Sequence, residues 1–109
     1  TGGVNEMAYY TLYCIGMMYQ LMGDYEKAIE SHMLAEPFCD FRNEHIVGLA
    51  ECYRDIGDFE GMKYQTERLV DPERKLPFPQ CYFLVNNSFY IDSGNYGKKL
   101  HQIACDNYK

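Results

Sequence analysis

The sequence has few positive charges and no long apolar run. Its 109 residues include 10 Lys and Arg against 16 Asp and Glu, so the net charge is −6. Nucleic-acid backbones and anionic membranes attract clustered Lys and Arg, so this balance disfavours both as partners. No apolar stretch approaches the roughly 20 residues of a membrane span, and the N-terminus does not resemble a signal peptide. We therefore expect a cytoplasmic protein whose partner is a protein or peptide with a basic or neutral surface.

The five cysteines include no Cys-x-x-Cys spacing, and their odd number leaves at least one unpaired. This usage favours reduced, mostly buried thiols in a reducing compartment. Two pairs, His101 with Cys105 and His45 with Cys52, have helical spacings that could each supply two zinc ligands. No further pair completes a tetrahedral site. We therefore expect no metal and no cofactor.

The sequence also lacks the residue spacings of an enzyme. His32 lies on the inner side of a predicted helix, and no Ser or Cys nucleophile is paired with it at a recognisable distance. We interpret His32 as a core or interface residue. The acidic pairs Asp24 with Glu26 and Asp58 with Glu60 fall at predicted helix starts, where carboxylates complement the helix dipole. The chain is therefore not expected to be an enzyme.

What the sequence does contain is a repeated helix–corner–helix segment. Residues 19–28 read YQLMGDYEKA, and residues 53–62 read YRDIGDFEGM. Gly57 follows Gly23 at a distance of 34 residues. Matched chemistry at such a period is typical of stacked helical hairpins, in which each unit buries its apolar face against its neighbours.

The first predicted helix starts at a cap on Asn5 and runs to about Met22. Gly16 lies inside it, where glycine costs about 1 kcal/mol relative to alanine. We therefore expect a neighbouring helix to approach closely at Gly16, with Ala28 as the facing residue. Apolar residues at three- and four-residue steps predict one buried stripe. The stripe consists of Ala8, Leu12, Ile15, Tyr19 and Met22.

The next helices follow the same plan. A helix of about Tyr25 to Ala35 starts from the Gly23-Asp24 corner and ends before Pro37. Its inner side carries Ala28, Ile29, His32 and Ala35. A third helix, capped by Asn43 or Asp40, runs to about Ile56, and its stripe consists of Ile46, Leu49, Ala50 and Tyr53. A fourth, Phe59 to Val70, presents Met62, Tyr64 and Leu69.

The pattern changes after the fourth helix. Residues 71–79 hold three of the four prolines and predict a stiff, extended connector. A helix is expected over about 81–90, then a turn over 92–96, and finally a helix over 98–109 with Leu100, Ile103, Ala104 and Tyr108 on one face.

These segments resemble tetratricopeptide repeats. The first repeat covers about 9–42 and the second about 43–76, followed by the connector and a partial third repeat of about 80–109. Leu12 stands where the family usually has tryptophan, and Met62 stands where it prefers alanine. The positions that carry the resemblance are Gly16, Tyr19, Gly23, Tyr25, Ala28, Ala50, Tyr53, Gly57 and Phe59.

Two alignments of the third repeat stay open. In one, residues 93–96 form a third corner, although Gly94 follows Gly57 by 37 residues rather than 34. In the other, Ala104, Cys105 and Tyr108 occupy positions of a new first helix. We favour the second alignment because it accounts for both the proline connector and the point at which the sequence stops.

The resemblance implies an all-α fold, an α-α superhelix of two clear repeats plus a partial third. The first helix of each hairpin would line a concave groove that binds an extended peptide or a partner helix. The chain would then be a non-catalytic interaction or scaffold module and a fragment of a longer protein, with self-association through exposed repeat ends. The groove residues would be Tyr10, Tyr13, Met17, Gln20, Leu21, Glu44, Val47, Glu51, Arg54 and Asp55.

The chemistry of this groove argues against one known use of the family. Some members hold a partner's C-terminal carboxylate with lysines and asparagines, but Tyr13 and Met17 replace those donors here and only Arg54 remains. The Tyr and Met residues suit adaptable apolar contact. The alternative is that they pack against a neighbouring repeat or subunit.

A weaker resemblance concerns the parent protein. Two such repeats, the Leu-Pro-Phe-Pro connector and a helix such as residues 100–108 are similar to helical tails behind the catalytic domain of some family 2 glycosyltransferases. This chain contains no nucleotide-sugar domain and no Asp-x-Asp motif. The alternative function is therefore an accessory segment of such an enzyme, without activity of its own.

Overall fold

The computed structural model describes residues 2–69, 71 and 94–107, and all regular structure in these residues is helical. The expected all-α fold is confirmed for this part of the chain. None of the described helices is long and apolar enough to cross a membrane. The predicted connector, apart from Asp71, and the predicted helix over 81–90 lie outside the described residues. The helices are α1 (Gly2–Leu21), α2 (Tyr25–Ala35), the short 3-10 helix η1 (Glu36–Phe38), α3 (Glu44–Asp55), α4 (Phe59–Leu69) and α6 (Asn95–Asn107).

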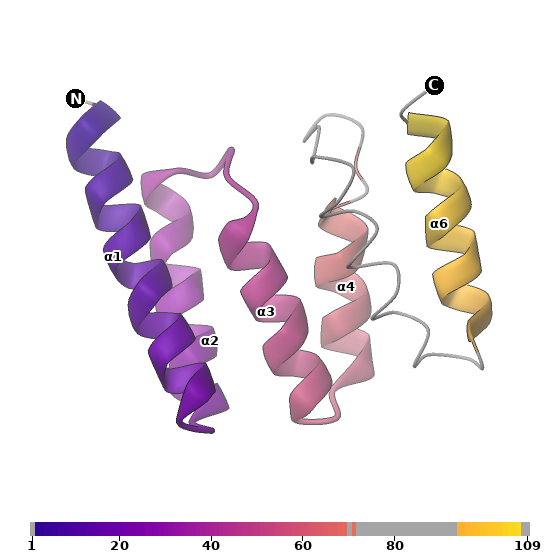
Figure 1. Ribbon diagram of the computed structural model, residues 1–109, viewed down its shortest axis with the longest axis horizontal. Helices are drawn as coiled ribbons and strands as arrows, with labels where there is room; N and C mark the ends of the chain where they lie inside the picture. The colour runs from indigo at the N-terminus through magenta and orange to yellow at the C-terminus, as the bar shows by residue number, and fades with distance from the viewer. Residues whose placement is uncertain (1, 70, 72–93, 108–109) are drawn as a thin grey trace.

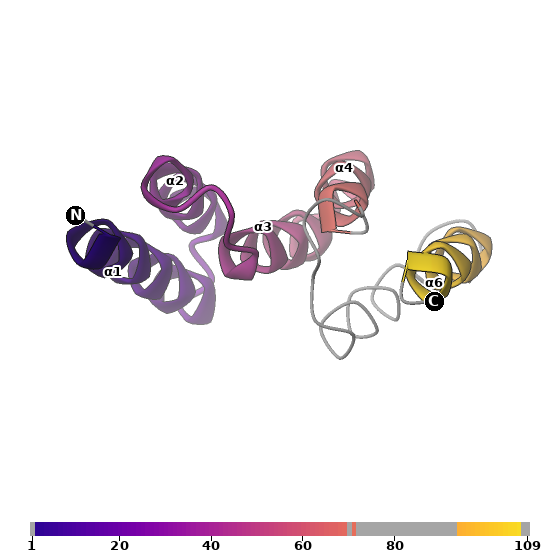
Figure 2. The same ribbon diagram turned by 90° about the horizontal axis from the view of Figure 1, so that it is seen from above.

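The helices stand side by side in a row (Figure 1). α1 and α2 form one antiparallel hairpin and α3 and α4 a second, while α2 also packs against α3 and so joins the two hairpins. Seen from above, α1 and α3 lie in one layer and α2 and α4 in the other (Figure 2). α6 runs in the same direction as α2 and α4.

The two corners of the hairpins have the same geometry. Gly23 and Gly57 both adopt φ +82°, the left-handed conformation that ends a helix most readily at glycine. In both corners the aspartate after the glycine donates its backbone N–H to the carbonyl five residues earlier, at 2.9 Å. Its carboxylate then accepts a backbone N–H of the next helix, from Lys27 to Asp24 at 3.3 Å and from Gly61 to Asp58 at 3.0 Å. The predicted glycine stops and aspartate caps are therefore confirmed.

Small residues let the helices approach one another. Ala28, Ala35 and Ala50 are fully or almost fully buried between helices. Larger side chains fill the remaining space, and full burial of one such side chain contributes about 1.5–3 kcal/mol. These larger residues are Tyr9, Ile46, Leu49, Met62 and Leu69.

The neighbour of Gly16 is not the residue that the sequence suggested. A Cβ atom added to Gly16 would lie 2.7 Å from Cε1 of His32, and the three nearest atoms all belong to this ring rather than to Ala28. A Cβ atom on Gly48 of α3 would lie 2.5 Å from Nε2 of the same ring. The imidazole therefore occupies a slot between two glycines, one on α1 and one on α3. Close approach at Gly16 is correct, but its partner is a ring one helical turn beyond Ala28.

The predicted start of the first helix is wrong, and its predicted stripe is only partly right, since Ala8, Leu12 and Tyr19 are half-buried. α1 begins at Gly2, so Asn5 lies inside it rather than at its cap. The fully buried side chain of α1 is Tyr9, whereas Met22 is 68% exposed and Ile15 is 38% exposed. The physical reason is that α1 is apolar on nearly every side, so periodicity alone cannot select the face that packs. The same error occurs on α4, where Tyr64 is 62% exposed while Met62 and Leu69 are buried.

α6 begins earlier than the sequence predicted. The helix starts at Asn95, directly after Gly94 at φ +89°, rather than at Lys98. Tyr96 packs against α4, and its hydroxyl lies 3.0 Å from Oε1 of Glu67. The left-handed glycine followed at once by a helix favours the alignment with a third corner over the alignment that we preferred.

Candidate partner-binding face

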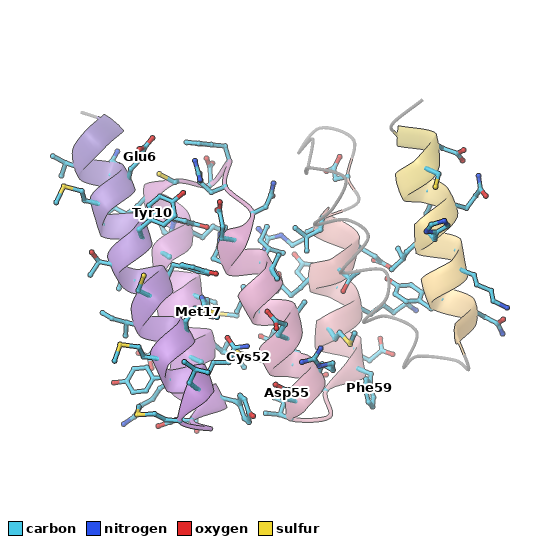
Figure 3. The ribbon with its side chains drawn as sticks, in the orientation of Figure 1. Glu6, Tyr10, Met17, Cys52, Asp55 and Phe59 are labelled. Atoms are coloured by element: carbon cyan, nitrogen blue, oxygen red, sulfur yellow. The ribbon has the colours of Figure 1, made fainter. Side chains whose placement is uncertain are left out.

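The ten predicted groove residues lie on two neighbouring helices of one layer. Five belong to α1 and five to α3, and these helices contact each other directly. Figure 3 shows Tyr10 and Met17 on the side of α1 that faces α3, with Asp55 at the far end of α3. We call this surface the front face. Leu21 and Asp55 are exposed, whereas the other eight residues are half-buried: Tyr10, Tyr13, Met17, Gln20, Glu44, Val47, Glu51 and Arg54.

An aromatic cluster holds the α1 side of the front face. The ring of Tyr9 is buried between α1 and α3, and Tyr10 meets it edge-on at 5.3 Å between ring centroids. Tyr13 stacks parallel to Tyr9 at 6.5 Å and lies 5.6 Å from the ring of His32. Such aromatic pairs contribute roughly 0.5–1.5 kcal/mol beyond burial. Tyr10 and Tyr13 therefore pack within the molecule through one side of each ring, as the packing alternative required, and remain partly open on the other.

Arg42 holds Tyr10 in place from the loop before α3. Its guanidinium lies 5.1 Å from the centre of the Tyr10 ring and donates a hydrogen bond to the Tyr10 hydroxyl. It also forms an ion pair with Glu44 at 2.9 Å. Burial alone would raise the pKa of Glu44, but the hydrogen bonds from Arg42, the backbone and Tyr9, together with the charge of Arg42, outweigh it, so this pKa lies below its ordinary value. Sequence reasoning missed Arg42 because no spacing rule connects residue 10 with residue 42.

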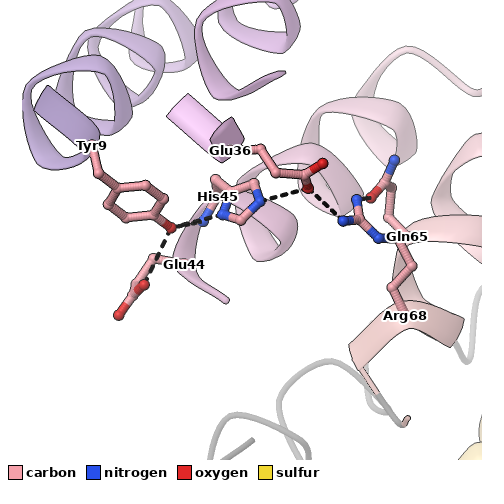
Figure 4. Close-up of polar contacts among 6 residues, drawn as sticks. All are labelled: Tyr9, Glu36, Glu44, His45, Gln65 and Arg68. Carbon is pink, nitrogen blue, oxygen red and sulfur yellow. Dashed lines mark hydrogen bonds and ion pairs between the residues drawn. The ribbon is translucent and has the colours of Figure 1, made fainter. Parts of the chain in front are cut away.

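A partly buried chain of polar contacts links the helices (Figure 4). The Tyr9 hydroxyl accepts the backbone N–H of His45 at 3.0 Å and lies 2.7 Å from Nδ1 of the same residue. Nε2 of His45 lies 2.9 Å from Oε1 of Glu36. Arg68 donates to the same Glu36 oxygen and, at 2.9 Å, to Gln65. The chain therefore ties together α1, η1, α3 and α4.

The protons of this chain can be assigned from its acceptors. Burial alone would raise the pKa of Glu36, but hydrogen bonds from Arg68 and His45 lower it overall, so the carboxylate is ionised and only accepts. Nε2 of His45 then donates to Glu36. The Tyr9 hydroxyl has two acceptors within reach, Oε2 of Glu44 at 3.2 Å and Nδ1 of His45 at 2.7 Å. Burial, above all other causes, raises the pKa of Tyr9. Tyr9 and His45 are both inaccessible to solvent, so this chain fixes the joint between the hairpins rather than meeting a substrate.

The α3 end of the front face is polar and mainly acidic. Arg54 donates to Asp55 at 3.1 Å and is thereby neutralised by its neighbour in sequence. Burial raises the pKa of Glu51, with Arg54 partly opposing the shift. A carboxylate clamp of the kind rejected from the sequence would need exposed cations here. The described residues of the front face supply carboxylates instead.

The positions that carry the repeat pattern are placed as follows. Gly23 and Gly57 form the corners, and Gly16, Ala28 and Ala50 are buried at helix contacts. The rings of the pattern are less buried: Tyr19, Tyr25 and Tyr53 are half-buried, and Phe59 is 44% exposed.

The two candidate zinc pairs differ in the structure. His101 and Cys105 meet on α6, with Nε2 and Sγ 3.6 Å apart. His45 is instead bonded to Tyr9 and Glu36, and burial raises the pKa of the Cys52 thiol to about 12. Within residues 2–69, 71 and 94–107, no three His, Cys, Asp or Glu side chains gather as a metal site would require.

Comparison with known proteins adds no relative. The sequence matches no protein-family model, and a search of curated proteins finds no significant match.

Proposed function

We propose that this chain is a tetratricopeptide-like helical-repeat module that binds an extended peptide or a helix of a partner protein on the front face. The proposal rests on one observation above all. Tyr13 and Met17 are half-exposed on α1 while internal contacts fix the Tyr13 ring, so binding would order few additional side chains. Preorganised aromatic side chains of this kind bind with a small entropic cost.

The charge of the surface restricts the partner. Glu51 and Asp55 lie on the α3 part of the front face, and the cation there, Arg54, is paired with Asp55. A segment with an apolar or aromatic half and a basic half would complement α1 and α3 in turn. The net charge of −6 acts in the same direction by attracting such a segment from a distance.

The proposed compartment is the cytoplasm. The described cysteines Cys14, Cys39, Cys52 and Cys105 are all free thiols. Free thiols persist where glutathione and thioredoxin keep cysteine reduced, which supports this location.

A selection experiment tests the proposal. Peptides selected from a random display library on the wild-type chain should be enriched in Lys, Arg and aromatic residues. Their binding should weaken by about tenfold or more in a Tyr13→Ala, Met17→Ala double variant, because truncation of an important interface side chain typically costs more than about 1 kcal/mol. Tyr64→Ala is the matched control, because Tyr64 is exposed on the opposite layer. Equal binding by wild type and double variant, with helicity unchanged, would exclude the front face as the binding surface.

A further inference from the structure

α1 carries a second apolar surface on its outer side. Its exposed residues recur at alternating three- and four-residue steps, the spacing of a coiled-coil seam. Among them Leu21 is 86% exposed and Met7 is 73% exposed. Ile15 and Met22 flank this row and are also exposed. The row, which we call the α1 seam, consists of Val4, Met7, Thr11, Cys14, Met18 and Leu21.

The α1 seam lies on the opposite side of the helix from Tyr9 and Gly16, which face the core. Figure 1 places α1 at the end of the row of helices, and no described helix stands beyond it. The seam adjoins the front face along α1 and shares Leu21 with it, whereas Tyr10, Tyr13, Met17 and Gln20 belong to the front face alone.

The second hairpin shows what such a surface does when it is covered. Adding the repeat distance of 34 residues to Thr11, Cys14 and Met18 gives His45, Gly48 and Cys52. These three residues of α3 are buried, and Gly48 contacts α2 through His32. These three exposed positions of α1 are thus helix-packing positions on α3, whereas the counterparts of Val4, Met7 and Leu21 are exposed.

The charged residues near the α1 seam indicate which surface can pack against it. Glu6 is the one charged residue in α1, and it does not belong to the seam. Two α1 seams can therefore meet without a like-charged pair inside the contact. Head-to-tail stacking of copies is disfavoured, because α6 at the other end of the row exposes Lys98 and Lys99. Placing these ammonium groups against the seam would bury them without partners.

The area of the seam is also sufficient. Its four large apolar residues, with Ile15 and Met22, expose a surface of the same order as the roughly 800 Å² that each partner buries in a standard interface. Isolated exposed apolar residues are common, but a continuous patch of this size on a monomer indicates an interaction site.

We propose that two copies of this chain associate through the α1 seam to form a two-fold symmetric dimer. The seam is self-complementary in either orientation. In an antiparallel pair Val4 faces Leu21, and Thr11 faces Cys14 of the other copy. In a parallel pair each residue faces its own counterpart, so the two Cys14 thiols meet. Apart from Leu21, which both surfaces share, the front faces of both copies stay open.

Sedimentation of the 109-residue chain tests the dimer. The wild type is expected to be a dimer at micromolar concentration, and Met18→Glu should weaken association by more than about tenfold by burying an unpaired carboxylate. Met33→Glu is the matched control, since Met33 is 48% exposed on α2, and it should leave the dimer intact. A wild type that stays monomeric into the millimolar range overturns the proposal. Equal effects of the two variants also overturn it.

Oxidative cross-linking locates the contact within the dimer. A covalent dimer of the wild type that disappears in Cys14→Ser identifies the parallel pair. A covalent dimer that forms readily only in Thr11→Cys identifies the antiparallel pair, because the new thiol then faces Cys14 at disulfide distance. A non-covalent dimer in which neither chain cross-links through residue 11 or 14 uses another surface and contradicts the proposal. Peptide binding to the front face should survive Met18→Glu, so the two proposals can fail independently.

Discussion

The two hairpins have the same backbone plan but different neighbours. Their corners repeat at 34 residues with the same glycine conformation and the same aspartate caps. The side chains above the corners differ. Lys27 lies 5.6 Å from the centre of the Tyr19 ring, whereas its counterpart Gly61 lets the ring of Tyr53 press directly on the helix. The repeat therefore sets the path of the chain, and single residues set the contacts made along it.

The largest difference lies at the joint between the hairpins. His32 of α2 is buried between Gly16 and Gly48, and its Nδ1 has no hydrogen-bond partner among the described residues. Its counterpart on α4 is Thr66, which is buried but donates to the carbonyl of Met62 at 2.7 Å. The first hairpin thus holds a buried titratable ring where the second holds a satisfied hydroxyl.

The largest expected effect is the loss of stability of the folded chain at acidic pH. Burial, with a smaller effect from His45, lowers the pKa of His32 from 6.5 to about 4. The unfolded chain binds a proton at His32 below about pH 6.5, whereas the folded chain binds this proton only below about pH 4. The free energy of unfolding should therefore fall by about 3 kcal/mol over this range from this residue alone. Chemical denaturation at pH 7 and pH 4 measures it.

The control for this prediction makes the first hairpin resemble the second. His32→Thr should be less stable at pH 7 because a cavity replaces the ring. Its loss of stability on acidification should nevertheless be smaller than that of wild type. The remaining loss of stability comes from carboxylates such as Glu36. Because the pKa of Glu36 is lowered in the folded chain, stability also decreases as the pH decreases. An identical pH dependence in both proteins would contradict the assignment.

A matched pair of glycine substitutions compares the contact between the hairpins, at Gly48, with a contact inside the second hairpin, at Gly61. Gly48→Ala places a Cβ atom 2.5 Å from a ring that Gly16 confines on its other side, so we expect a loss of about 2 kcal/mol. Gly61→Ala brings a Cβ atom 2.8 Å from Cδ1 of the half-buried Tyr53 ring and 3.0 Å from Oδ2 of the exposed Asp58. The gain in helix propensity, up to about 1 kcal/mol, should offset most of that contact. Thermal unfolding of both variants measures the difference. Equal shifts would show that the packing around Gly48 is no tighter than the packing around Gly61.

The smallest expected effect tests where the hairpins are alike. Asp24→Ala and Asp58→Ala each remove one capping hydrogen bond, and each should cost about 1 kcal/mol. Because the two corners share one geometry, the two losses should agree closely in urea denaturation. A cost at one corner only would mean that the corners differ in energy despite their matching dihedral angles.

The sequence predicts the parts of the fold that depend on local chemistry. Gly23 and Gly57 each need a positive φ followed by an aspartate, so the corners and the limits of α2, α3 and α4 could be placed closely. The buried face of α1 could not, since a helix with one charged residue offers apolar side chains in every direction. Only the position of α2 and α3 decides that Tyr9 is buried and Met18 is not.

The polar contacts at the joint were beyond sequence reasoning for another reason. Tyr9, Glu36, His45 and Arg68 come from four elements, and no period links their positions. The ring of His32 could be assigned to the interior, but its slot requires a glycine at position 48, outside the repeat pattern that located Gly16. Contacts between repeats depend on how the hairpins twist against each other, which a 34-residue period does not specify.

The hydrogen bonds of Glu36 have a mechanical consequence. Oε1 of Glu36 accepts hydrogen bonds from both His45 and Arg68. Glu36 is also the first residue of η1, the short helix at the end of the first hairpin. A force that pulls α4 away from η1 must break the contact with Arg68, and a force that pulls α3 away must break the contact with His45. The connection between the hairpins is therefore braced on both sides by one carboxylate, which should resist bending of one hairpin against the other.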